Sequence, residues 1–119
     1  IARETARHYG SSVREIITMG TPLIGGPKYT SVGGVYARMT GMDVDMFEME
    51  VHERNSVGLD QPLTVIFSKS DGVVGWTAAQ DLYNQQTRHI EVRSTHFGLG
   101  VNPTVWKIVA DTLAENRGA

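Results

Sequence analysis

Three short segments rich in β-branched and other apolar residues constrain the fold more than any other feature of this chain. They lie at 13–19, 62–68 and 88–93, and the second is the nearly continuous apolar run typical of a strand buried on both faces. Helical patterns alternate with them, at 1–9, at 76–83 and from Asn102 onward. Strands that alternate with helices pair in parallel through crossover connections. The sequence therefore predicts an α/β fold with about three parallel strands and flanking helices.

The segment between the first two predicted strands, residues 22–61, is longer than a plain crossover needs. Within it, residues 31–55 mix methionines and acidic residues in a pattern closer to helix than to strand. We predict two short helices that form a small cap or lid over one end of the sheet. The methionines of this cap either fill its own core or adapt to an apolar substrate. The whole chain, 1–119, is then a single domain.

Composition excludes several classes of function. The net charge is -2 and the 11 lysine and arginine residues are scattered, which argues against a nucleic-acid partner. Cysteine is absent, so a disulfide framework, a zinc–thiolate site and a thiol nucleophile are excluded. No apolar run approaches the roughly 18 residues of a membrane span. The chain opens at Ile1 directly in a helical pattern, and we expect it to belong to a longer protein.

Three loops follow the predicted strands and carry the residues best suited to chemistry. They are Gly20-Thr21-Pro22, Ser70-Asp71-Gly72 and Thr95-His96-Phe97. Ligands bind outside the carboxyl ends of parallel strands, so these loops should meet at one edge of the sheet. A carboxylate fixes the tautomer of an imidazole, which then takes a proton from a nucleophile and returns it to the leaving group. We predict Asp71 as the acid and His96 as the base of such a pair.

Several residues also have ordinary explanations. Asp71-Gly72 is a common turn pair, and a histidine such as His96 is often a plain loop residue. Asp43 and Asp45 lack the further ligands and the glycine of a calcium loop, so a solvated face is favoured there. The glycine-rich residues 25–34 lack a nucleotide-binding pattern. We therefore expect no metal and no cofactor.

Three stretches, residues 16–26, 65–74 and 94–99, resemble the α/β-hydrolases, in particular bacterial esterase-like or lipase-like members. The resemblance implies a partial α/β-hydrolase fold in which Asp71 is the triad acid, His96 is the triad base and 22–61 is the cap. It also implies a small-molecule ester or lipid substrate. The predicted substrate-binding residues are Thr21, Pro22, Trp76 and Phe97, although packing between a helix and the sheet is the favoured role for Trp76.

One part of the family pattern is missing. The nucleophilic serine of such proteins lies in a Gly-x-Ser-x-Gly elbow, and this chain contains no such pattern. By the resemblance, residues 1–9 form the helix that follows the elbow, so the chain corresponds to the C-terminal half of the fold. Ser31 lacks the first glycine of the elbow, and a site built on Ser31 or Ser94 through oligomerisation remains open.

Two functions of different classes follow. The first is hydrolysis of carboxylic esters by a Ser-His-Asp mechanism, with this chain supplying acid and base only. The alternative is a catalytically inactive fragment that acts as an oligomerising or interaction module. Within these 119 residues, one edge of the strand at 13–19 would have no neighbouring strand. We expect a homo-oligomer, or pairing with the N-terminal half of the fold, through this edge.

Overall fold

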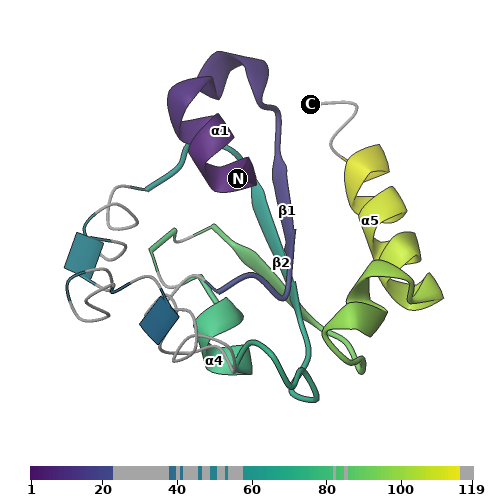
Figure 1. Cartoon of the computed structure of the whole chain (residues 1–119). Helices are drawn as coiled ribbons and strands as arrows, with labels where there is room; N and C mark the ends of the chain where they lie inside the picture. The colour runs from purple at the N-terminus through teal and green to yellow at the C-terminus, as the bar shows by residue number, and fades with distance from the viewer. Residues whose placement is uncertain are drawn as a thin grey trace.

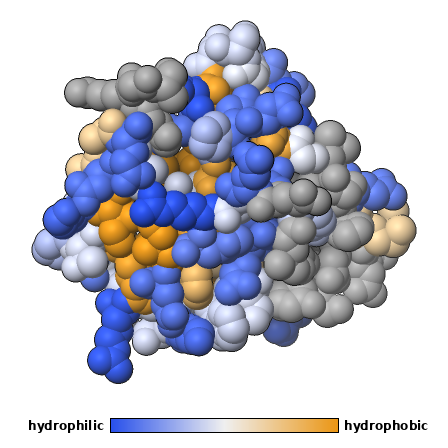
Figure 2. Space-filling view, turned by 180° about the vertical axis from the view of Figure 1, so that it is seen from behind, coloured by the Kyte–Doolittle hydropathy of each residue, from blue (hydrophilic) through white to orange (hydrophobic). Residues whose placement is uncertain are grey.

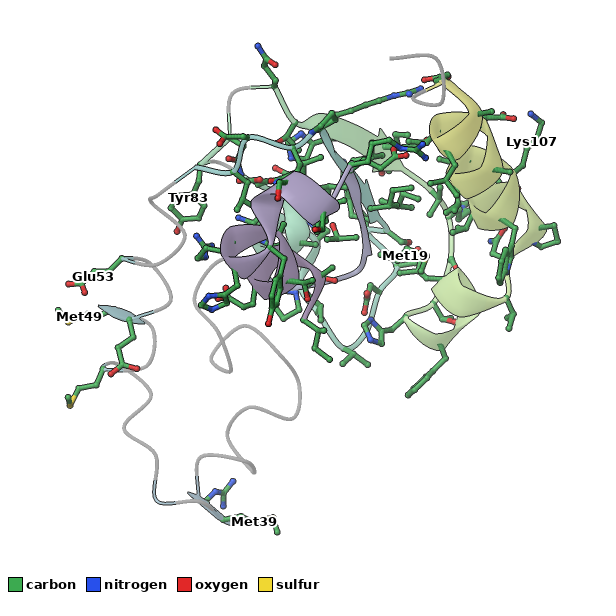
Figure 3. All side chains as sticks on the ribbon, turned by 90° about the horizontal axis from the view of Figure 1, so that it is seen from above. Met19, Met39, Met49, Glu53, Tyr83 and Lys107 are labelled. Carbon is green, nitrogen blue, oxygen red and sulfur yellow. The ribbon has the colours of Figure 1, made fainter. Side chains whose placement is uncertain are left out.

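The computed structural model describes residues 1–22, 38–39, 41, 46, 49–50, 53, 58–81, 83–84 and 86–115. Most of the predicted cap at 22–61, with its two helices, therefore lies outside the described residues. Three methionines of this region are described, and Met39, Met46 and Met49 are all exposed. Met39 and Met49 lie on the far side of the molecule from Lys107 (Figure 3). These three side chains do not fill a core.

The structure confirms the predicted α/β character. Three parallel strands, β1 (Ile16–Met19), β2 (Leu63–Phe67) and β3 (Arg88–Glu91), form one sheet in the order β1-β2-β3 (Figure 1). Ile16 pairs with Leu63, and Thr64 pairs with Arg88. Each strand is shorter than predicted. The central strand β2 is buried along its whole length, as its apolar run indicates.

Helices pack on both faces of this sheet. The helical elements are α1 (Ala2–His8), η1 (Gly10–Ser12), α4 (Trp76–Ala79), η3 (Phe97–Gly100) and α5 (Pro103–Glu115). On one face, Val65 and Phe67 of β2 pack in a cluster with residues of α1 and α4. On the other face, Ile66 packs with Leu99 of η3 and with Val105 of α5. Side chains that alternate between faces of the central strand therefore anchor both helical layers.

The second face is less completely covered. Ile108 and Val109 of α5 are only partly buried against its cluster. Seen from behind, apolar atoms show between hydrophilic side chains at the surface of the molecule (Figure 2). On α5, Val105 and Thr112 are buried, whereas the large apolar side chains of Trp106 and Leu113 are exposed. No described helix is both long enough and apolar enough to cross a membrane.

The helix predicted at 76–83 ends at Ala79, four residues early. Gln80 is extended, with ψ of 144°. The Asp81 carboxylate then accepts the backbone N–H groups of Tyr83, at 2.8 Å, and Asn84, at 3.2 Å. A short acidic side chain that bonds the backbone two and three residues ahead competes with helical hydrogen bonding, and here it ends the helix.

Asp81 also joins three parts of the fold. Its carboxylate accepts a hydrogen bond from Arg3 of α1 at 3.1 Å, and both side chains are buried. Its backbone N–H donates to Nε2 of His89 on β3 at 3.0 Å. The buried ion pair therefore ties the first helix to the loop between α4 and β3. Arg3 and Ala6 are the buried residues of α1.

Candidate active site

Asp71 and His96 meet at the carboxyl ends of β2 and β3, as predicted. Asp71 Oδ2 lies 2.8 Å from His96 Nδ1. The Asp71 side chain is 2% exposed, whereas the imidazole is 29% exposed. The carboxylate is therefore held inside the protein, and the ring reaches the surface. Among the described residues, Nε2 of His96 makes no hydrogen bond, so this atom is available to exchange a proton with a ligand.

Three donors converge on the Asp71 carboxylate. Oδ1 accepts the backbone N–H of Val73 at 2.8 Å and that of Val74 at 2.9 Å, while Oδ2 faces His96. Burial raises the pKa of Asp71, but the hydrogen bonds from Val74, His96 and Val73 outweigh it and hold the pKa below its ordinary value. Asp71 is thus an acceptor at neutral pH, which places the imidazole proton on Nδ1 and leaves Nε2 able to act as a base.

The buried hydroxyl of Ser68 holds together the two loops that carry this pair. Its Oγ accepts the backbone N–H of Ser70, in the loop before Asp71, at 3.1 Å. The same atom accepts the N–H of Ser94, in the loop before His96, also at 3.1 Å. Ser68 is 1% exposed. Sequence analysis did not identify this role, although a serine that ends an otherwise apolar strand was the available signal.

Gly20, at the end of β1, lies directly against the pair. A Cβ at this position would be 2.9 Å from Asp71 Oδ2 and 3.2 Å from His96 Nδ1, and 2.8 Å from Leu99 Cδ1. The backbone of Gly20 also has φ of 60°, a conformation that favours glycine. Glycine is therefore favoured at this position for two reasons, the lack of space for a Cβ and the positive φ. The contact also shows that the carboxyl end of β1 lies within reach of the Asp71–His96 pair.

The four predicted substrate-binding residues occupy different surroundings. Phe97 is 84% exposed, and its ring meets the His96 ring edge-on at 5.8 Å between centroids. Trp76 begins α4 and stacks on Phe67 of β2 at 6.3 Å, so it packs that helix on the sheet. Thr21 and Pro22 are half-buried beyond the end of β1. The structure thus brings Phe97 to the pair, while the ring of Trp76, which is 38% exposed, contacts Phe67 and Lys69.

The outer edge of β1 is open among the described residues. Ile16 and Gly20 donate their N–H groups to the carbonyls of Pro62, just before β2, and Ile66, at 2.9 Å in each case. Because hydrogen bonding along a parallel strand alternates, the N–H groups of Ile17 and Met19 face the other edge. A groove of about 230 Å³ runs beside that edge, between β1 and the first turn of α1.

Two buried polar groups line this groove without satisfying all their hydrogen bonds. Nε and Nη2 of Arg3, and Oγ1 of Thr18, have no hydrogen-bond partner among the described residues. Thr18 is 6% exposed and Arg3 is 7% exposed. Buried polar atoms are usually hydrogen-bonded, so these atoms are exceptions within the fold.

Removal of the Ser68 hydroxyl is expected to loosen both loops of the site. Ser68→Ala leaves two partly buried N–H groups without their acceptor, so it should lower the free energy of unfolding by about 1–3 kcal/mol. Urea unfolding followed by circular dichroism measures this change. Ser94→Ala is the matched control, because the Ser94 hydroxyl donates only to the adjacent Thr95 carbonyl near the surface. Equal stability of the two variants would contradict the bridging role of Ser68.

Among the described residues, no group of three or more histidine, aspartate or glutamate side chains could hold a metal ion. Nor does any described hydroxyl bond to His96. Ser94 is directed to the Thr95 carbonyl at 3.0 Å, and Ser31 lies outside the described residues. Comparisons of the chain with family models, curated proteins and solved structures found no match.

Proposed function

We propose that Asp71 and His96 are the acid and base of a serine hydrolase of the α/β-hydrolase type, which acts on carboxylic esters. The observation that carries this proposal is the 2.8 Å contact between a buried carboxylate and a partly exposed imidazole at the carboxyl ends of adjacent parallel strands. This geometry supplies what acyl transfer needs from these two groups.

The chemistry assigned to each group follows from its surroundings. Nε2 of His96 takes the proton of a serine hydroxyl as that oxygen attacks the ester carbonyl, and then gives it to the departing alcohol. A water molecule repeats the sequence to release the acid and free the serine. Asp71 stays ionised throughout and stabilises the imidazolium, which agrees with its lowered pKa.

The open edge of β1 offers a position for the strand that carries the serine. Neighbouring strands lie about 4.8 Å apart, so a strand paired with β1 would end one such step from Gly20. Gly20 itself contacts the Asp71–His96 pair. A residue just beyond the end of the added strand is then placed to reach Nε2 of His96.

The exposed side chains near the pair favour a substrate with an apolar group. Phe97 is 84% exposed beside His96, and Met19, at the end of β1, is 43% exposed. Apolar surface that borders a polar reactive pair is typical of sites for partly apolar ligands. An ester with an aliphatic acyl or alcohol portion fits these surroundings.

The second candidate function is an interaction module without catalysis. The same open edge favours it, since an unpaired parallel strand is a template for pairing with a second copy of the chain. In that case the groove beside β1 is filled by another protomer, and His96 has no nucleophile.

Labelling with a fluorophosphonate serine probe separates the two functions. Ester hydrolysis predicts one covalent adduct on the full protein, detected by intact mass and located by peptide mapping. It also predicts that the labelled serine lies on a segment that pairs with β1. Absence of an adduct, together with self-association in sedimentation velocity, would favour the interaction module. A monodisperse, unlabelled monomer that unfolds cooperatively would contradict both.

A further inference from the structure

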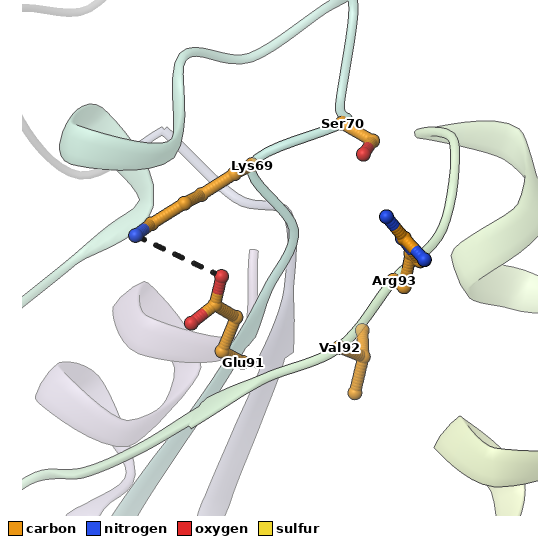
Figure 4. Close-up of a pocket in the computed structure, with 5 residues that line it drawn as sticks. All are labelled: Lys69, Ser70, Glu91, Val92 and Arg93. Atoms are coloured by element: carbon orange, nitrogen blue, oxygen red, sulfur yellow. Dashed lines mark ion pairs between the residues drawn. The ribbon is translucent and has the colours of Figure 1, made fainter.

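A hollow of about 400 Å³ lies between the ends of β2 and β3, apart from the groove beside β1. Its walls are Lys69 and Ser70 on one side and residues 91–93 on the other (Figure 4). Ser70 directly precedes Asp71, so the hollow adjoins the loop of the candidate active site.

Hydrogen bonds hold the two walls in a fixed relation. Val92 donates its N–H to the Phe67 carbonyl at 2.8 Å. On the other side of Arg93, Ser94 donates to the Ser68 hydroxyl, which also accepts from Ser70. The backbone of Arg93 is thus tied to β2 through both of its neighbours. The backbone that carries the guanidinium therefore needs no rearrangement when a ligand binds.

The charges that line the hollow are not balanced. Lys69 is engaged with its surroundings, because its Nζ lies 3.9 Å from Glu91 and 4.8 Å from the centre of the Trp76 ring. Arg93 forms no ion pair or hydrogen bond with any described side chain. Figure 4 shows its guanidinium between Ser70 and Val92, with the Lys69–Glu91 pair across the hollow. The excess charge is a single positive one, and it resides on Arg93.

We propose that this hollow binds the carboxylate of a monoanionic organic ligand. The planar guanidinium of Arg93 matches a carboxylate in a two-point hydrogen bond, and the Ser70 hydroxyl supplies a further donor. One excess positive charge suits a carboxylate better than a phosphate dianion, which Glu91 would repel. Where the proposed ester hydrolysis holds, the site selects esters that carry a free carboxylate. That extension rests on the proposed function, whereas the binding site itself does not.

Titration of the full protein with butyrate, followed by backbone amide NMR, tests the site directly. Butyramide is the neutral probe of nearly the same shape. Butyrate is expected to cause saturable shifts centred on the amides of Ser70 and Arg93, and butyramide is expected to cause none there. Arg93→Ala should weaken butyrate binding about tenfold or more, because it removes a charged hydrogen-bond donor. Glu91→Gln should strengthen it severalfold by removing the repelling charge.

Arg88→Ala is the matched control, since Arg88 lies on the same strand but pairs with Glu115 at 3.0 Å. This variant should bind butyrate as the parent protein does. Equal affinity for butyrate and butyramide, or equal weakening in Arg88→Ala and Arg93→Ala, would overturn the proposal. Binding should persist in His96→Ala, so a failure of ester hydrolysis and a failure of this site give different results.

Discussion

Replacement of His96 with alanine is expected to lower the rate of ester hydrolysis on the order of 10⁶-fold, because the base that activates the nucleophile is lost. Asp71→Asn is expected to lower the same rate on the order of 10⁴-fold, although it keeps the shape of the site. An amide at this position no longer fixes the proton on Nδ1, so Nε2 is left in the wrong protonation state. The measurement is kcat of the full protein for a chromogenic short-chain ester.

His8→Ala is the matched control for this pair of variants. His8 ends α1, is exposed, and belongs to neither the candidate site nor the hollow. It should leave kcat unchanged. If His96→Ala and His8→Ala hydrolyse the ester at the same rate, His96 is not the base. If the activity of each variant falls only as far as its fraction of folded protein falls, the loss reflects stability. The proposal then loses its main support.

Replacement of Asp81 with alanine is expected to destabilise the protein by about 3–5 kcal/mol, the usual consequence of removing one partner of a buried ion pair. Arg3 is 7% exposed and would remain buried with its charge uncompensated. The change also removes the acceptor for the N–H groups of Tyr83 and Asn84. Because marginal domains have little stability to spare, the variant should be mostly unfolded at moderate temperature, as thermal unfolding will show.

The surface pair of Lys107 and Asp111 provides the control for that experiment. Its atoms lie 2.6 Å apart, closer than those of Arg3 and Asp81, but both side chains are exposed. Asp111→Ala should leave the unfolding transition where it is. A similar loss of stability in the two variants would show that burial of the Arg3–Asp81 pair has no special importance.

The Asp81 carboxylate makes the stability of the fold depend on pH. Burial raises the pKa of Asp81, but hydrogen bonds from Asn84, Tyr83 and Arg3 outweigh it and hold the pKa below its ordinary value. A carboxyl with a lowered pKa in the folded state stabilises the fold above its unfolded pKa. That stability is lost as pH falls through the folded value, so the decline begins below about pH 4. Asp81→Asn should flatten this decline.

The sequence was sufficient for the features that depend on local pattern. Alternating apolar segments predicted the three parallel strands, and the position of Asp71 and His96 after successive strands predicted their contact. The start of α5 was also predictable, because Asn102 accepts the N–H of Thr104 at 2.8 Å in the expected manner. These features follow from residues that are close together in the chain or from the general geometry of parallel sheets.

Features set by distant contacts were not predictable in this way. Arg3 and Asp81 lie 78 residues apart, and nothing in the pattern of either segment indicates that they pair. The early end of α4 depends on a side chain that bonds ahead to the backbone, which helical periodicity does not register. The role of Ser68 requires knowing that two loops come within reach of one hydroxyl.

The order of strands along the chain has a consequence for synthesis on the ribosome. β1 is made first, but its partner β2 begins only at Leu63. At about 5–20 residues per second, the interval between Met19 and Leu63 lasts roughly 2–9 s. During this time the edge of β1 that β2 covers in the finished sheet has no partner. The nascent chain therefore passes through a stage in which this apolar edge is open, and chaperones would be most useful to it then.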